Sequence, residues 1–164
     1  MSADSFALAA RLGRVLADRR WTAAAAESCT GGLIAGAITD VAGSSAWFDR
    51  GFVTYSNAAK QELLRVRRST LKKHGAVSEE TAREMALGAL ARSRASVAVS
   101  VTGVAGPGGG SRDKPVGMVC FGWAQGRRLR SETRKFNGNR ESVRRQSVVH
   151  ALKGVMALLE ERKP

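Results

Sequence analysis

The sequence is poor in cysteine and contains no recognisable metal-binding or redox motif. Only Cys29 and Cys120 occur among its 164 residues, which is too few for a disulfide framework and leaves no C-x-x-C pair. The two histidines are equally scattered, so the chain offers no zinc-ligand spacing, and no metal is expected. Two unpaired thiols are typical of a reduced intracellular protein, and we expect a cytoplasmic location.

Long apolar runs are also missing. A membrane-spanning helix needs about 20 consecutive apolar residues, whereas the longest uncharged run, residues 95–111, is broken by glycine and proline. Near the start of the chain, Arg11 interrupts a short apolar stretch, which does not fit a signal peptide. The sequence therefore predicts no association with a membrane.

Acidic residues are scarce relative to basic ones. The chain has 27 Lys and Arg against 14 Asp and Glu, a formal net charge of +13. A basic surface attracts polyanions, either nucleic acid or small phosphorylated molecules. Aromatic residues make up only 5%, with a single tyrosine, so the chain offers few surfaces on which bases could stack. Nucleic acid is therefore the less favoured partner, and a phosphorylated small molecule is favoured.

The pattern of apolar residues predicts one α/β domain covering residues 1–164. Valines at alternate positions from 97 to 101 favour a strand, and a segment at 116–124 that is apolar on both faces favours an interior strand. Ser56 and Asn57, as well as Ser78 followed by two glutamates, favour helix starts. Helices are expected at residues 6–20, 33–39, 58–64, 78–92 and 141–159, and strands at 47–55, 95–101, 116–124 and 129–136. Early alternation of helices and strands, followed by two consecutive strands, indicates helical layers around a mixed sheet with a late antiparallel pair.

The first candidate for chemistry is the turn Ser28-Cys29-Thr30-Gly31-Gly32, placed between a run of small residues and a helix. A helix N-terminus presents unpaired N–H groups that stabilise a phosphate or a developing oxyanion. The two glycines allow a ligand to approach the backbone closely. Ser28 and Cys29 are both candidate nucleophiles, and the motif alone is also compatible with an ordinary capped turn.

The second candidate combines Tyr55 and Asn57 with Lys60, which lies one turn into the next predicted helix. A lysine acts as a general base only if its pKa falls from about 10.4 toward neutrality through burial or a neighbouring cation. The alternative is an ordinary surface lysine.

Two further segments favour an anionic ligand. Thr102, Gly103 and Gly106 belong to a glycine-rich loop after a strand, a place where phosphate or ribose commonly binds, although the loop lacks the order of a dinucleotide or P-loop motif. Arg140 and Arg144 are four residues apart and share one helix face, where they could grip an anion. A flexible connection and solvated arginines are the alternatives.

Taken together, five motifs in order resemble the CinA carboxy-terminal domain family. They are ESCTGG at 27–32, GFVTYSN at 51–57 with Lys60, GAVS at 75–78, TGVAGP at 102–107 and KPVG at 114–117. The resemblance covers nearly the whole chain and implies a three-layer α/β/α sandwich. It also implies hydrolysis of nicotinamide mononucleotide to nicotinate mononucleotide and ammonia, a salvage step that needs no cofactor, and a homodimer.

The resemblance assigns Ser28 as nucleophile and Tyr55 and Lys60 as its partners in proton transfer. The residues it implies for the substrate are Thr30, Gly31, Gly32, Asn57, Thr102, Gly103, Gly106, Arg140 and Arg144. One departure is Asn139, where the family often has aspartate before the arginine, which weakens the assignment of Arg140. The competing hypotheses are an inactive nucleotide-binding relative of the family and a basic protein that binds nucleic acid.

Overall fold

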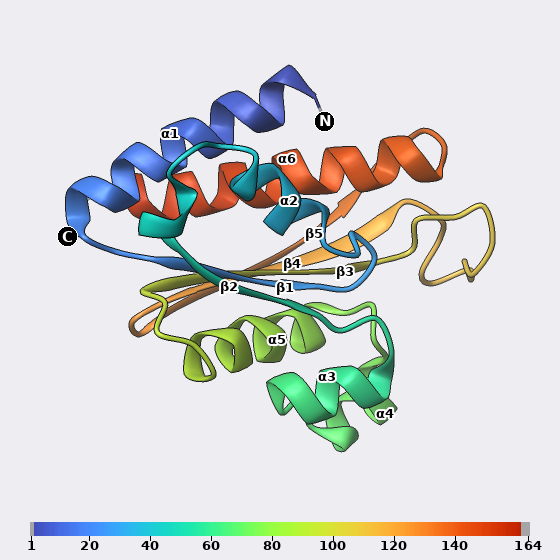
Figure 1. Ribbon diagram of the computed structural model, residues 1–164. Helices are drawn as coiled ribbons and strands as arrows, with labels where there is room; N and C mark the ends of the chain where they lie inside the picture. The colour runs from blue at the N-terminus through green and yellow to red at the C-terminus, as the bar shows by residue number, and fades with distance from the viewer. Residues whose placement is uncertain (1, 162–164) are drawn as a thin grey trace.

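The computed structural model describes residues 2–161, so both ends of the predicted domain at 1–164 lie outside the described residues. In this part of the chain a five-stranded sheet lies between two layers of helices (Figure 1). The helices are α1 (Ala3–Arg19), α2 (Leu33–Thr39), α3 (Asn57–Leu64), α4 (Arg68–His74), α5 (Glu79–Ala91) and α6 (Arg140–Glu160). The strands are β1 (Ala23–Glu27), β2 (Phe48–Val53), β3 (Val97–Gly103), β4 (Met118–Gln125) and β5 (Arg128–Lys135).

The strand order is β2-β1-β3-β4-β5. Strand β1 pairs in parallel with β2 and β3, and β4 pairs antiparallel with both β3 and β5. The predicted mixed sheet with a late antiparallel pair is therefore confirmed. Helices α1, α2 and α6 cover one face, here called the upper layer, and α3, α4 and α5 form the lower layer (Figure 1). The three-layer α/β/α expectation is thus also confirmed.

The strands β1 and β3 at the centre of the sheet are buried along nearly their whole length and carry mainly small or β-branched side chains. Ala23 and Ala25 of β1 face the upper core, whereas Ala24 and Ala26 face the lower one. Strand β4, predicted to lie in the interior, is buried on both faces. Gly122 in this strand permits close packing, because a Cβ there would lie 2.5 Å from the Ala82 carbonyl oxygen of α5.

The helix starts follow the predicted caps. Ser56 and Ser78 begin α3 and α5, and each side chain accepts a hydrogen bond from the N–H three residues later. Helix α4 was not predicted, because its sequence shows no apolar periodicity and buries only Thr70 and Leu71. A short 3-10 helix, Ser44–Ala46, precedes β2. None of the helices in residues 2–161 combines the length and apolarity that crossing a bilayer requires.

Candidate active site

The parallel strands β1, β2 and β3 end at the same edge of the sheet, and the segments that follow them surround a cavity of about 290 Å³. Ligands of α/β proteins commonly bind at this edge. Eight residues expected in the site line this cavity: Ser28, Tyr55, Asn57, Lys60, Thr102, Gly103, Gly106 and Arg140. The other four, Thr30, Gly31, Gly32 and Arg144, lie outside its lining.

Lys60 is the largest fully buried side chain at this edge. It is 1% exposed, and its Nζ lies 2.9 Å from Ser28 Oγ. The same nitrogen lies 2.9 Å from the Thr54 carbonyl oxygen and 3.4 Å from that of Tyr55. Helix α3, begun by the Ser56 cap, carries Lys60 back over the end of β2 to reach these groups. The surface alternative for Lys60 is therefore wrong.

The charge of Lys60 has no direct compensation. No carboxylate in residues 2–161 forms an ion pair with it, and burial lowers the pKa of its amine below the usual value of 10.5. Nζ therefore has three oxygen acceptors around it, the Ser28 hydroxyl and the two carbonyl groups. Burial favours the neutral form of the amine.

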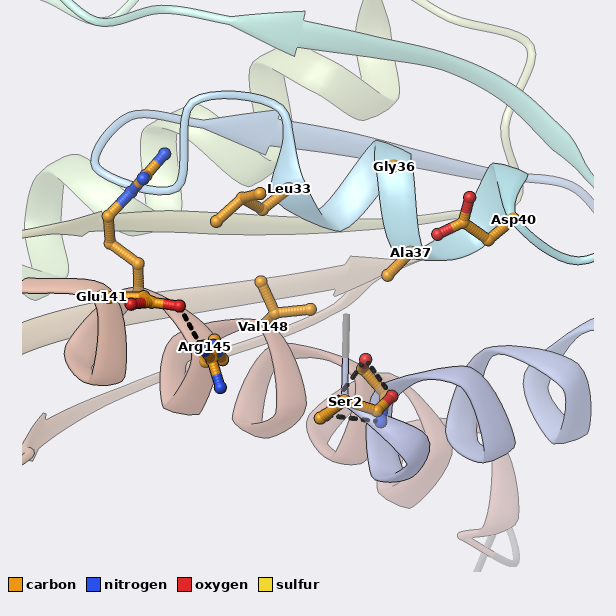
Figure 2. Close-up of a pocket in the computed structure, with 10 residues that line it drawn as sticks. Ser2, Leu33, Gly36, Ala37, Asp40, Glu141, Arg145 and Val148 are labelled. Atoms are coloured by element: carbon orange, nitrogen blue, oxygen red, sulfur yellow. Dashed lines mark hydrogen bonds and ion pairs between the residues drawn. The ribbon is translucent and has the colours of Figure 1, made fainter.

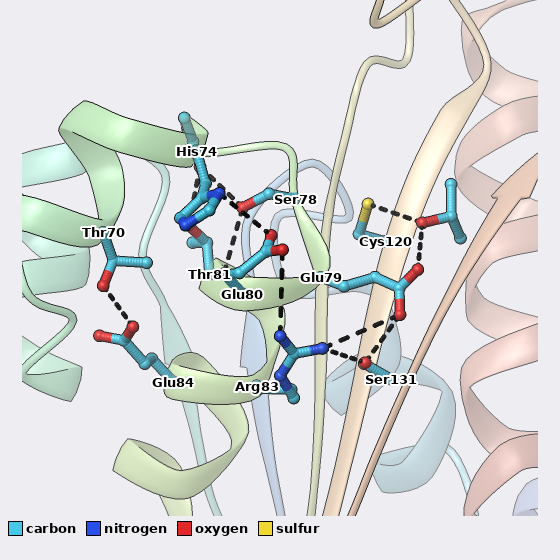
Figure 3. Close-up of polar contacts among 12 residues, drawn as sticks. Thr70, His74, Ser78, Glu79, Glu80, Thr81, Arg83, Glu84, Cys120 and Ser131 are labelled. Atoms are coloured by element: carbon cyan, nitrogen blue, oxygen red, sulfur yellow. Dashed lines mark hydrogen bonds and ion pairs between the residues drawn. The ribbon is translucent and has the colours of Figure 1, made fainter.

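The neighbouring thiol of Cys29 has a raised pKa. Cys29 is 6% exposed, and its burial raises the pKa of the thiol to about 11. A thiol with this pKa is protonated near neutral pH and is a poor nucleophile. The ring of His74 lies not beside Cys29 but near Glu80 of α5, at 3.7 Å (Figure 3). Of the two candidate nucleophiles, Ser28 is the one in hydrogen-bond contact with the Lys60 amine.

The turn after β1 is held by its own backbone and by Glu27. The Ser28 N–H donates to the Val101 carbonyl, and the Gly31 N–H donates to the Ser28 carbonyl, both at 3.0 Å. The fully buried carboxylate of Glu27 accepts the N–H groups of Ile34 and Ala35, at 2.9 and 3.0 Å. The expectation that the start of α2 offers open N–H groups to a ligand is therefore wrong, because Glu27 occupies two of them.

The backbone of the turn nevertheless keeps unused donors. No acceptor in the described residues takes the N–H groups of Cys29, Thr30 or Gly32. Sequence reasoning missed Glu27 as the residue that holds this turn together. Its signal was a carboxylate at the end of a buried strand, six residues before a helix start.

Tyr55 and Arg140 meet at the rim of the cavity. One Nη of Arg140 donates to the Tyr55 phenol oxygen at 3.1 Å, and the other donates to the Gly106 carbonyl at 2.9 Å. The phenol is therefore turned toward Arg140, and only the main-chain carbonyl of Tyr55 contacts Lys60. The side chain of Tyr55 is 61% exposed.

Two other expected residues shape the walls around this rim. Thr102 is buried and donates to the Ala76 carbonyl at 2.8 Å, which ties the end of β3 to the segment before α5. Asn139, the departure from the family pattern, begins α6 and accepts the Ser142 N–H at 2.9 Å. Asparagine and aspartate cap helices equally well, so this substitution leaves the helix start that carries Arg140 intact.

A second cavity, of about 450 Å³, lies between the start of α1, α2 and α6. Its walls include Leu33 and Ala37 from α2 and Val148 from α6, and Glu141 pairs with Arg145 at one end (Figure 2). Arg144 also lines this cavity, and the two cavities share no lining residue.

The chain matches the model of the CinA C-terminal domain over residues 5–159. It belongs to the CinA C-terminal domain family. It is 59% identical over 146 residues to nicotinamide-nucleotide amidohydrolase PncC of Enterobacter agglomerans, covering 88% of this chain and 89% of that protein. The PncC protein of Escherichia coli K12 is 54% identical over 146 residues, covering 88% of each chain.

Solved structures of CinA proteins share the whole architecture. The crystal structure of competence/damage inducible protein CihA from Agrobacterium tumefaciens superimposes with a TM-score of 0.94 at 47% identity, covering 98% of both chains. A competence damage-inducible protein A from Klebsiella pneumoniae superimposes with a TM-score of 0.93 at 38% identity, covering 97% of this chain and 99% of the other.

Proposed function

We propose that this protein is a nicotinamide-nucleotide amidohydrolase that converts nicotinamide mononucleotide to nicotinate mononucleotide and ammonia. The observation that carries the proposal is the 2.9 Å contact between Ser28 Oγ and a buried, unpaired lysine amine in a cavity at the sheet edge. The PncC names of relatives at 54–59% identity supply the substrate class. A serine beside a base is the arrangement that acyl transfer requires.

In the proposed mechanism the Lys60 amine accepts the Ser28 proton while Oγ attacks the carboxamide carbon. The tetrahedral intermediate collapses as its C–N bond breaks, and the Lys60 ammonium returns the proton to the departing ammonia. Water then gives a proton to Lys60 and attacks the carbonyl carbon of the resulting ester. The C–Oγ bond breaks, Lys60 returns its proton to Ser28 Oγ, and the nicotinate product leaves as the carboxylate. The burial of Lys60, together with the lack of an ion pair to it in residues 2–161, supports the neutral form of its amine at the start of this cycle.

The oxyanion formed in each half of the reaction needs donors that are already in place. The unused N–H groups of the turn after Ser28 are suited to this role. In known enzymes, losing one such donor costs about 3–4 kcal/mol of transition-state stabilisation. We assign the role to the backbone N–H of Cys29, which lines the cavity, together with that of the adjacent Thr30, whereas the Gly31 N–H is already used within the turn.

Arg140 is the proposed anchor for the substrate phosphate. Its guanidinium now contacts two neutral oxygens, those of Gly106 and Tyr55. Hydrogen bonds to a charged phosphate are about twice as strong as those to neutral acceptors, so a phosphate would replace them. Asn57 and the glycine loop, which line the same cavity, would contact the rest of the bound nucleotide. The Tyr55 phenol, no longer hydrogen-bonded to Arg140, could then turn toward Ser28 and Lys60.

The direct test measures ammonia release from nicotinamide mononucleotide by the purified protein in buffer with a chelator. We expect turnover by the wild type and a loss of at least about 10⁴-fold in Ser28→Ala, because the nucleophile is removed. Ser45→Ala, an exposed serine outside the cavity, is the matched control and should retain full activity. Turnover retained in Ser28→Ala would move the nucleophile to Cys29 or to water.

A folded wild type that releases no ammonia would contradict the proposed function. It would favour an inactive nucleotide-binding relative of the family. Binding of nicotinamide mononucleotide by calorimetry, with loss of binding in Arg140→Ala, would then test that second hypothesis.

We further infer a cytoplasmic homodimer that does not bind nucleic acid. Many basic side chains are already paired with carboxylates, among them Arg11–Glu160, Arg67–Glu84, Arg128–Glu161 and Arg134–Glu132. Light scattering should give about twice the 17.4 kDa chain mass, and cell fractionation should recover the protein with the cytoplasm. Steeply salt-dependent binding to random DNA would contradict the inference about nucleic acid.

A further inference from the structure

Arg144 contacts the turn that follows Ser28 from outside the cavity. Its Nε donates to the Cys29 carbonyl oxygen at 3.0 Å, and its Nη2 donates to the Thr30 carbonyl oxygen at 3.3 Å. The same Nη2 lies against Gly31, since a Cβ at that position would be 3.3 Å away. One half-buried guanidinium therefore touches three consecutive residues of the turn.

The contact with the Cys29 carbonyl determines where a neighbouring N–H points. In a planar trans peptide the carbonyl and the N–H point in opposite directions. The Cys29 carbonyl shares its peptide group with the Thr30 N–H, so a carbonyl fixed on Arg144 directs that N–H away from α6. No acceptor in residues 2–161 takes the Thr30 N–H. The next peptide is also fixed, because the Thr30 carbonyl contacts Arg144 and the Gly31 N–H donates to Ser28.

We propose that Arg144 is a positioning residue that holds the turn after Ser28, and with it the unused N–H groups of Cys29 at the cavity lining and of the adjacent Thr30, in place as oxyanion donors for the acyl transfer at Ser28. This inference rests on the proposed function. The guanidinium acts through the peptide and does not touch the substrate, in contrast to the direct anion grip expected from the sequence. Its cationic hydrogen bond to the carbonyl also polarises the peptide, which strengthens the N–H as a donor.

The inference predicts which kinetic constant changes. An oxyanion donor binds the tetrahedral transition state more strongly than the neutral carboxamide, so losing it lowers kcat and changes KM little. A residue that gripped the phosphate would raise KM instead. A residue that only stabilised the fold would lower the melting temperature and leave kcat of the folded fraction unchanged.

The experiment compares Arg144→Met, Arg144→Lys and Arg144→Ala with the wild type in ammonia release from nicotinamide mononucleotide. We expect kcat to fall about 10²-fold in Arg144→Met, in the range for loss of one donor, with KM within about threefold. Arg144→Lys should recover only part of kcat, because a single ammonium cannot match the two-carbonyl contact of the guanidinium fork. Arg145→Met is the matched control: Arg145 is the next residue, is exposed and pairs with Glu141, and its loss should leave kcat unchanged.

Chemical rescue by added guanidinium distinguishes a positioning role from a purely structural one, because a purely structural role predicts no change in kcat. Guanidinium ion at low millimolar concentration should raise kcat of Arg144→Ala several-fold and have no effect on the wild type or on Arg145→Met. Wild-type kcat in folded Arg144→Met, or a raised KM with unchanged kcat, would overturn the inference.

A second substrate separates this inference from the proposed function. The burst of p-nitrophenolate from p-nitrophenyl acetate reports acylation of Ser28 without any nicotinamide nucleotide. A wild type that shows the burst but releases no ammonia would refute the proposed function alone, and a burst slowed in Arg144→Met would still support the role of Arg144. A burst of equal rate in both proteins would overturn the role of Arg144.

Discussion

The two helical layers of this protein hold the sheet by different means. Above the sheet, α1, α2 and α6 bury large apolar side chains, such as Leu12, Ile34 and Leu152, against the valines of β3. Below it, α5 meets β3 mainly through small side chains and hydrogen bonds, for example from Ser100 to the Ala82 carbonyl. At the β5 end of the lower layer, Ser131 and Thr133 donate to the carboxylate of Glu79 (Figure 3).

The candidate active site draws one reacting group from each layer. The turn that carries Ser28 is held from the upper layer by α2 through Glu27 and by α6 through Arg144. Lys60 comes from α3 in the lower layer. The contact between Ser28 and Lys60 therefore joins an apolar layer, which holds the turn that carries Ser28, to a more polar layer, which supplies the buried amine. Stability and reactivity should respond differently to changes in the two layers.

The largest expected loss of stability lies in the upper layer. Trp123 is 4% exposed, stacks on Phe121 and donates its indole N–H to the Ala151 carbonyl at 3.0 Å. We expect Trp123→Ala to lower the free energy of unfolding by about 3–5 kcal/mol, because it leaves a cavity between β4 and α6. Urea unfolding measures this, with Trp123→Phe as the milder control. A loss below about 1 kcal/mol would contradict the picture of the upper layer as the main source of stability.

The next effect concerns the cost of burying Lys60. Burial lowers the pKa of its amine in the folded protein. Between that pKa and the unfolded value near 10.5, the unfolded chain binds a proton that the folded chain lacks. The free energy of unfolding therefore rises with pH across this window, by up to about 1.4 kcal/mol per pH unit. We expect the wild type to gain stability relative to Lys60→Met as the pH rises from neutral to about 10.5.

Urea unfolding of both proteins at several pH values measures this difference. Subtracting the Lys60→Met values removes the contributions of all other titrating groups. A difference between the two proteins that does not change with pH would show that Lys60 keeps its ordinary pKa in the fold.

The smallest expected effect lies in the lower layer. Ser100 is buried, and its hydroxyl donates to the Ala82 carbonyl of α5. Ser100→Ala removes this bond while the small volume is nearly conserved, so we expect a loss of about 0.5–1.5 kcal/mol. Thermal unfolding with the wild type in parallel measures it. A loss as large as that of Trp123→Ala would remove the contrast between the two layers.

Much of the fold was predictable because local patterns decide it. The alternate valines of β3, the serine caps of α3 and α5 and the apolar faces of β4 all appear as the sequence predicts. The sequence does not predict helix α4, because tertiary contacts hold this helix and its sequence has no apolar periodicity. In these contacts Glu84 of α5 accepts hydrogen bonds from the Arg67 N–H and from the Thr70 hydroxyl.

The site was predictable as a set of residues but less so as a set of contacts. Ser28 and Lys60 are 32 residues apart and meet because β1 and β2 are parallel neighbours, which spacing alone does not reveal. The roles of Glu27 and Arg144 depend on which way backbone N–H and carbonyl groups point. The orientation of the Tyr55 phenol toward Arg140 is likewise a property of the folded rim.

The measurement that tests the central claim most directly is the pH dependence of kcat/KM for nicotinamide mononucleotide. If a buried, neutral Lys60 is the base for Ser28, kcat/KM should rise with pH between about pH 6 and about pH 9 and level off at a pKa well below 10.5. Circular dichroism across the same range confirms that the protein stays folded. A profile that is flat over this range would contradict the account and leave Lys60 as an electrostatic partner only.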